Sequence, residues 1–159
     1  MSKTRHGLCI FVENEFGVIQ RVTNLFSARG MNIDTIHTTP VDSIANVSQI
    51  SISLIETEKN IELIQKLLMR LLIVHEVHHI EIPMVENQPY ISQVFKVQNE
   101  FVFVLQVKKV LEQYEVTCFN VYSNPKIHCI TGTQKVVSAL TKHLSEIQSF
   151  VTVKEYNVF

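Results

Sequence analysis

The sequence predicts an α+β fold built from two consecutive βαββαβ modules. Short apolar and β-branched runs alternate with stretches whose apolar residues recur at helical spacing, and the same order of elements occurs twice. The 159 residues suffice for two small domains. Only four glycines and four prolines are present, so sharp turns are few and long regular elements fill most of the chain.

A strand and a helix open the first module. Residues 8–12 form a continuous apolar run between polar neighbours, which is typical of a strand at the centre of a sheet. An amphipathic helix is predicted next, and it ends near Gly30, where a left-handed cap is expected. Its apolar residues follow the i, i+4, i+7, i+8 spacing: Val18, Val22, Leu25 and Phe26.

Two strands, a helix and a further strand complete the first module. Residues 33–39 are rich in β-branched side chains, and residues 50–54 alternate between apolar and polar, so we expect an antiparallel pair with one polar face. Thr57 is predicted to cap the second helix, and a strand over 74–80 follows. This order is the ferredoxin-like arrangement. The helix has one apolar face: Ile61, Ile64, Leu68 and Leu71.

The second module follows a linker predicted over residues 83–90, where two prolines flank polar residues. We expect a helix early in this module, but a strand is the alternative prediction for the same segment, because the run Phe101 to Val104 suits either. We therefore predict domains over residues 1–82 and 91–159. The expected elements of the second are a strand over 91–97, a helix over 99–112, strands over 116–122 and 127–131, a helix after Thr133 with an apolar face reaching Ile147, and a strand over 150–156.

Composition excludes several classes of partner and location. Lysine and arginine number 14 against 15 aspartates and glutamates, so no basic surplus favours nucleic acid or an anionic membrane. No apolar stretch reaches the 18 or so residues of a membrane span. The three cysteines are odd in number and form no C-x-x-C pair, which fits a reducing compartment. We expect a cytoplasmic protein that binds neither nucleic acid nor membrane.

The segment His75-Glu76-Val77-His78-His79 matches the H-E-x-x-H pattern of zinc hydrolases. That chemistry needs a helix, on which two histidines one turn apart hold zinc and the glutamate acts as general base. Here the flanking β-branched residues and Pro83 favour a strand. A small zinc hydrolase using His75, Glu76 and His79 is therefore the least favoured interpretation, and we assign no catalytic or metal-binding residue.

The loop Glu13 to Gly17 is the best candidate for a binding site. A loop ahead of a helix exposes unpaired backbone N–H groups at the positive end of the helix dipole, which suits a carboxylate. Gly17 lets a ligand approach the backbone. The amides of Asn14 and Asn32 can complement a zwitterion without adding net charge. Loop capping is the competing interpretation, because asparagine and glycine are ordinary turn residues.

These residues also carry a family resemblance. The stretch 8–33 closely resembles the opening of the small regulatory subunit of acetolactate synthase, also called acetohydroxyacid synthase, and looks like an ACT domain. The resemblance extends over the whole chain, and Thr131-Gly132-Thr133 matches the turn before the family's last helix. It implies an N-terminal ACT domain followed by a C-terminal ACT-like domain. The matching positions are Glu13-Asn14, Gly17, Arg21, Leu25-Phe26-Ser27, Arg29-Gly30 and Asn32-Ile33.

The resemblance implies a regulatory subunit without catalytic activity of its own. Its partner would be a large catalytic subunit that carries thiamine diphosphate, magnesium and FAD, while this chain carries no cofactor. The small subunit would activate that partner in branched-chain amino-acid biosynthesis and mediate feedback inhibition by valine or a related amino acid. A free-standing ACT-type amino-acid sensor that regulates another protein is the alternative.

The resemblance also places the effector at an interface between two ACT domains. Asn14 and Asn32 would then face one ligand from different protomers, so a homodimer is implied. Phe16 is bulkier than the residue common beside this glycine in the family. The effector-binding positions carried over are Asn14, Glu15, Phe16, Gly17, Val18, Asn32 and Ile33.

Overall fold

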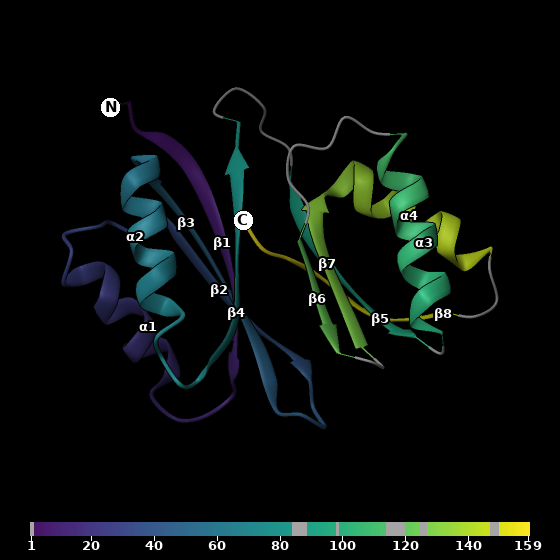
Figure 1. Cartoon of the computed structure of the whole chain (residues 1–159), viewed down its shortest axis with the longest axis horizontal. Helices are drawn as coiled ribbons and strands as arrows, with labels where there is room; N and C mark the ends of the chain where they lie inside the picture. Colours follow the sequence, from purple (N-terminus) through teal and green to yellow (C-terminus); the bar gives the residue numbers. More distant parts are fainter. Residues whose placement is uncertain (1, 84–88, 98, 114–119, 125–126, 147–149) are drawn as a thin grey trace. The chain divides into compact units, whose positions relative to one another are not determined.

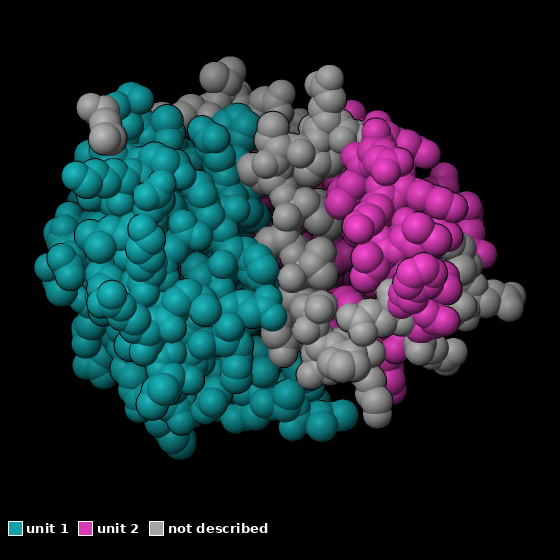
Figure 2. Space-filling model, in the orientation of Figure 1, with its two compact units in different colours: residues 1–87, 159 teal, residues 88–158 magenta. Residues whose placement is uncertain are grey.

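The computed structural model describes residues 2–83, 89–97, 99–113, 120–124, 127–146 and 150–159. The chain divides into two compact units, residues 1–87 with residue 159 and residues 88–158, which Figure 2 shows in different colours. The division lies within the linker predicted over 83–90, of which residues 84–88 are outside the described residues.

Unit 1 has the βαββαβ order expected from the sequence (Figure 1). Its four strands form one antiparallel sheet in the order β2-β3-β1-β4, so β1 is central and β2 and β4 lie at the edges. The fold-class prediction is confirmed for this unit. The elements are β1 (Thr4–Glu13), α1 (Val18–Ser27), β2 (Thr35–Asp42), β3 (Val47–Glu56), α2 (Glu58–Leu68) and β4 (Val74–Ile82).

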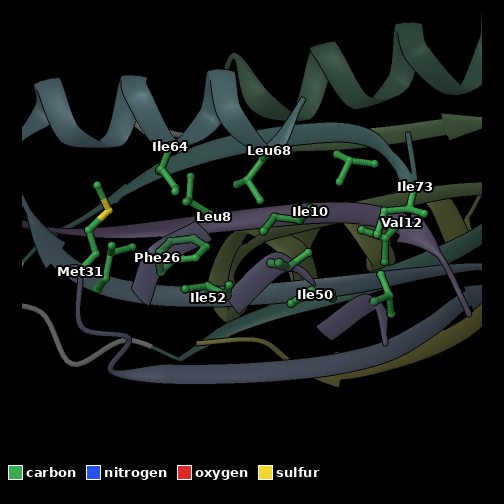
Figure 3. Close-up of a cluster of buried hydrophobic side chains, with 14 of the residues drawn as sticks. Leu8, Ile10, Val12, Phe26, Met31, Ile50, Ile52, Ile64, Leu68 and Ile73 are labelled. Carbon is green, nitrogen blue, oxygen red and sulfur yellow. The ribbon is translucent and has the colours of Figure 1, made fainter. Parts of the chain in front are cut away.

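The core of unit 1 lies between its sheet and its two helices. Alternate residues of β1 and β3 face the helices, and the apolar faces of α1 and α2 cover them. Figure 3 shows Ile64 and Leu68 of α2 directed toward Leu8 and Ile10 of β1. Each such side chain contributes about 1.5–3 kcal/mol by leaving water. This packing fixes where the loops at the ends of β1 and β3 lie.

The caps of the helices explain where they begin and end. The Thr57 hydroxyl accepts a hydrogen bond from the Asn60 N–H at 3.4 Å, which confirms the predicted start of α2. Gly30 has a φ of 65°, and the Met31 N–H donates to the Phe26 carbonyl at 3.0 Å across it. That bond is typical of a helix terminated by a left-handed residue. Gly30 therefore closes α1 as predicted.

Unit 2 repeats the arrangement with the strand order β6-β7-β5-β8. The helix predicted over 99–112 is confirmed as α3. On this helix Phe103 is buried, whereas Phe101 is 78% exposed. Residues 116–119 of one predicted strand and Ile147 lie outside the described residues. The elements are β5 (Tyr90–Val97), α3 (Glu100–Leu111), β6 (Asn120–Asn124), β7 (Ile127–Thr133), α4 (Gln134–Ser145) and β8 (Phe150–Asn157).

The core of unit 2 forms between α3, α4 and the sheet. Phe95 and Phe103 are in contact, with ring centroids 5.6 Å apart and ring planes tilted by 56°. In the part of the chain that the structure describes, no helix has the length and apolar character to cross a membrane. The core residues are Phe95, Val97, Phe103, Val107, Val110, Ile130, Leu140 and Leu144.

Candidate functional site

A pocket of about 530 Å³ opens where β1 passes into α1. The loop after β1, the first turns of α1 and the edge strand β2 form its wall. Five of the seven predicted effector-binding residues are brought together here, namely the run Asn14 to Val18. The full lining is Asn14, Glu15, Phe16, Gly17, Val18, Ile19, Gln20, Thr23 and Thr38.

The backbone at the start of α1 is open to a ligand. Gly17 is the N-cap residue, and within the described residues no side chain caps α1 and no acidic residue lies in its first turn. The Val18 N–H reaches the Glu15 carbonyl only at 3.4 Å. The first N–H groups of a helix have no partner inside the helix and lie at the positive end of its dipole. The wall of the pocket thus offers hydrogen-bond donors and partial positive charge.

The first helix of unit 2 begins differently. The corresponding first helix, α3, begins at Asn99, whose side chain accepts a hydrogen bond from the Val102 N–H at 3.2 Å. That bond satisfies one of the free donors. In α1 a glycine occupies the equivalent N-cap position and leaves the donors available.

Gly17 is required here by its backbone conformation. Its φ is 77°, in the left-handed region that residues other than glycine, asparagine and aspartate rarely adopt. A Cβ built at Gly17 would meet no atom within 4 Å. Space around the residue is therefore open, and the strain of the left-handed conformation is what excludes a larger residue.

Asn14 is held by its backbone while its side chain stays available. Its N–H donates to the Asn46 carbonyl at 2.7 Å, and the Asn46 side-chain amide donates to the Asn14 carbonyl at 3.0 Å. Asn46 lies in the turn between β2 and β3 with a φ of 56°. Within the described ranges, the Asn14 side chain makes no hydrogen bond. Both of its amide groups can therefore face a ligand.

Glu15 and Phe16 differ in their environments. The Glu15 carboxylate accepts a hydrogen bond from the Arg21 guanidinium at 2.7 Å, which offsets its charge beside the pocket. An exposed ion pair of this kind contributes only about 0–1 kcal/mol to stability. The Phe16 side chain is fully exposed. A single unit 1 therefore leaves a large aromatic ring in water at the rim of the pocket.

Asn32 and Ile33 do not line this pocket. They lie in the connection from α1 to β2, where Asn32 is exposed and Ile33 packs against the edge of the core. One chain therefore brings Asn14 and Asn32 to different places. The prediction that they meet across two protomers stays a prediction.

Four residues that line the pocket were not predicted from the sequence: Ile19, Gln20, Thr23 and Thr38. Gln20 and Thr23 follow Phe16 at helical spacing, a signal that could have placed them on the same face of α1. Thr38 gave no such signal, because it comes from β2 and reaches the site through the pairing of β2 with β3.

The H-E-x-x-H segment forms β4 and not a helix, so the zinc-hydrolase interpretation is wrong for it. His78 contacts the Glu76 carboxylate at 2.8 Å on one face of the strand. His79 lies on the other face, beside His6 of β1. The strand prediction for this segment is confirmed.

Comparison with known proteins shows the family. The domain family described as AHAS small subunit-like ACT domain matches residues 8–76. The acetolactate synthase small subunit of Buchnera aphidicola subsp. Schizaphis graminum is 33% identical over 138 residues, which cover 87% of this chain and 85% of that protein. The chain belongs to the acetolactate synthase small-subunit family. The resemblance seen in residues 8–33 is thereby confirmed.

Other members of the acetolactate synthase small-subunit family align over different lengths. The small subunit of Buchnera aphidicola subsp. Baizongia pistaciae is 27% identical over 153 residues, 95% of this chain and 93% of that protein. The isozyme 3 small subunit of Escherichia coli K12 is 39% identical over 67 residues, 42% of this chain and 40% of that protein. The crystal structure of the Thermotoga maritima small subunit is 23% identical, with 98% of each chain covered and a TM-score of 0.47.

Proposed function

We propose that this chain is the non-catalytic regulatory subunit of acetolactate synthase. It binds a large catalytic subunit, activates it in branched-chain amino-acid biosynthesis, and mediates feedback inhibition by valine or a related amino acid. The observation that carries the proposal is the 33% identity to a named small subunit across most of both chains. Thiamine diphosphate, magnesium and FAD belong to the catalytic partner, and the complex works in the cytoplasm.

The pocket at the start of α1 suits the backbone atoms of a free amino acid. The carboxylate binds the N–H groups of the first turn, where the helix dipole favours negative charge. The ammonium donates to the side-chain carbonyl of Asn14, which is free to accept. Since Arg21 neutralises Glu15, the site adds little net charge and fits a zwitterion. Ile19, 44% exposed, and Phe16 offer apolar contact to a branched side chain.

A second copy of the chain completes the site in this proposal. Asn32 does not line the pocket of its own chain and is exposed, so it is available to another protomer. The exposed ring of Phe16 would be buried by the same association. An effector bound between two ACT domains then favours one dimer geometry, and a coupling of about 1–3 kcal/mol is typical for such population shifts.

The test is reconstitution with the catalytic subunit from the same organism. Acetolactate formation is measured with and without this chain and with added valine, leucine or isoleucine. Asn14→Ala should abolish feedback inhibition and leave activation intact, because it keeps the backbone bonds to Asn46 and removes only the side-chain amide that would contact the effector. Asn24→Ala, an exposed substitution on the same loop-helix segment but outside the pocket, is the matched control.

The outcomes separate the proposal from its alternative. Loss of both activation and inhibition in Asn14→Ala, or of neither, contradicts the assignment of the site. If the chain binds an amino acid by calorimetry but neither associates with the catalytic subunit nor changes its rate, the free-standing sensor replaces the regulatory subunit.

A further inference from the structure

Two histidines and a glutamate converge on the helix-covered face of unit 1, at the end of the sheet opposite the pocket. His6 comes from β1, His79 from β4 and Glu58 from the first turn of α2. The pairing of Leu8 with His79 places the two histidines diagonally across neighbouring strands on one face. One potential ligand atom from each residue lies within 4.8 Å of the other two.

The distances are close to those of a metal site. The His6 Nδ1 is 2.8 Å from the His79 Nε2 and 3.9 Å from one Glu58 carboxylate oxygen. The other Glu58 oxygen lies 3.9 Å from the second ring nitrogen of His79, Nδ1, and only one nitrogen of that ring can bind a given ion. Ligands bound to one zinc at about 2.0–2.2 Å are roughly 3.3 Å apart in a tetrahedron. Only modest shifts are needed, and the Glu58 side chain, which is 59% exposed, has room to make them.

The hydrogen bonds of His6 fix which of its nitrogens carries the lone pair. Its Nε2 lies 3.1 Å from the Glu56 carbonyl oxygen and 2.9 Å from the Thr4 hydroxyl. A carbonyl oxygen only accepts, so Nε2 carries the hydrogen and the Nδ1 lone pair accepts a hydrogen bond from the His79 Nε2–H. A metal ion would take the place of that shared hydrogen. Metal-bound histidines almost always donate their other N–H to such an acceptor, which sets the ring orientation. His6 is fully buried and cannot turn away.

The donor types of the three residues suit a transition metal ion. Each imidazole can offer one nitrogen lone pair. The Glu58 carboxylate supplies negative charge and belongs to the donor types that zinc accepts together with histidine.

We propose that His6, Glu58 and His79 bind a divalent first-row transition metal ion, with Zn²⁺ as the best fit, that joins α2 to β1 and β4. Water can complete the coordination, because both Glu58 and His79 are partly accessible. The sequence alone predicts no metal ligand here, since these residues lie far apart along the chain. His6 and Asn14 are eight residues apart on an extended strand, about 26 Å, so the site is separate from the pocket.

The test is a zinc titration of the full chain, without a polyhistidine tag, after treatment with a chelator. Competition with a chromogenic chelator should show one zinc per chain, and added zinc should raise the melting temperature. His79→Asn and Glu58→Gln should weaken zinc binding by more than ~100-fold, since loss of a supporting hydrogen bond alone weakens metal sites 10- to 100-fold. Co²⁺ in place of zinc reports the coordination by its visible spectrum.

Matched controls lie beside the proposed ligands. His78→Asn changes the neighbouring histidine on the opposite face of β4, and Glu62→Gln changes an exposed carboxylate one turn along α2. Both should bind zinc like the unmodified chain. The proposal is overturned if the unmodified chain takes up no stoichiometric zinc, or if Glu58→Gln and His79→Asn, folded by circular dichroism, keep its affinity. Neither result bears on effector binding at Asn14.

Discussion

Replacement of Gly17 tests both the strain at the start of α1 and the openness of the pocket. Gly17→Ala should lower the free energy of unfolding of unit 1 by about 1–2 kcal/mol, the cost of placing a Cβ in the left-handed conformation. No steric term adds to this cost, because a Cβ meets nothing within 4 Å. For a domain of 60–100 residues each kcal/mol corresponds to about 4–8 °C in melting temperature.

A series at Gly17 separates backbone strain from other causes. Gly17→Asn should cost less than Gly17→Ala, since asparagine tolerates the left-handed region, and Gly17→Val should cost most. Gly30→Ala is the matched control, with a φ of 65° and an equally open Cβ position, and should lose a similar amount. Urea-induced unfolding of the full chain measures each difference. Equal stability of Gly17→Ala and the unmodified chain, or an Asn variant as unstable as the Val variant, would refute the reasoning.

Two further predictions concern the core and the acid response of unit 1. Phe26→Ala should lower the free energy of unfolding by about 3–5 kcal/mol, because the ring is fully buried. Phe16→Ala removes a fully exposed ring and should change the free energy of unfolding of a dilute single chain by no more than about 0.5 kcal/mol. Similar losses for the two variants in calorimetry would contradict this difference in burial. The Thr57 N–H, the Asn60 amide and the Lys3 ammonium hold the pKa of Glu56 below its usual 4.5, against the opposing effect of burial. The stability from these contacts is therefore complete above pH ~5 and is lost as pH falls through the lowered pKa. Glu56→Gln should lower the melting temperature at neutral pH and approach the unmodified chain in acid, and a constant difference across pH would argue against an ionised Glu56.

The elements that depend on local signals were predictable. Thr57 indicated the start of a helix and Gly30 the end of one, and both residues have the expected geometry. The run Phe101 to Val104 was ambiguous in isolation, because its side chains suit a strand. In the structure this run belongs to a helix, which Asn99 caps and which buries Phe103 and Val107 on one face. Tertiary packing, and not propensity, resolves that case.

Side chains that meet through strand register were not predictable. Asn14 to Val18 line the pocket together because they are contiguous, so one motif was enough to find them. Thr38 and the pair His6 and His79 come together only through the registers of β2 with β3 and of β1 with β4. A shift of one residue in either register would turn these side chains to the opposite face. The pattern along the chain does not specify that register by itself.

The two hydrogen bonds between Asn14 and Asn46 have an entropic consequence for ligand affinity. They hold the backbone at the rim of the pocket in place, so a ligand bound there would not need to order it. The conformational entropy still to be lost is mainly that of a few side chains, each about 0.5–1.5 kcal/mol. For the amino-acid effector proposed above, which has few atoms to contribute contacts, preorganisation of this kind would lower the entropic cost of binding.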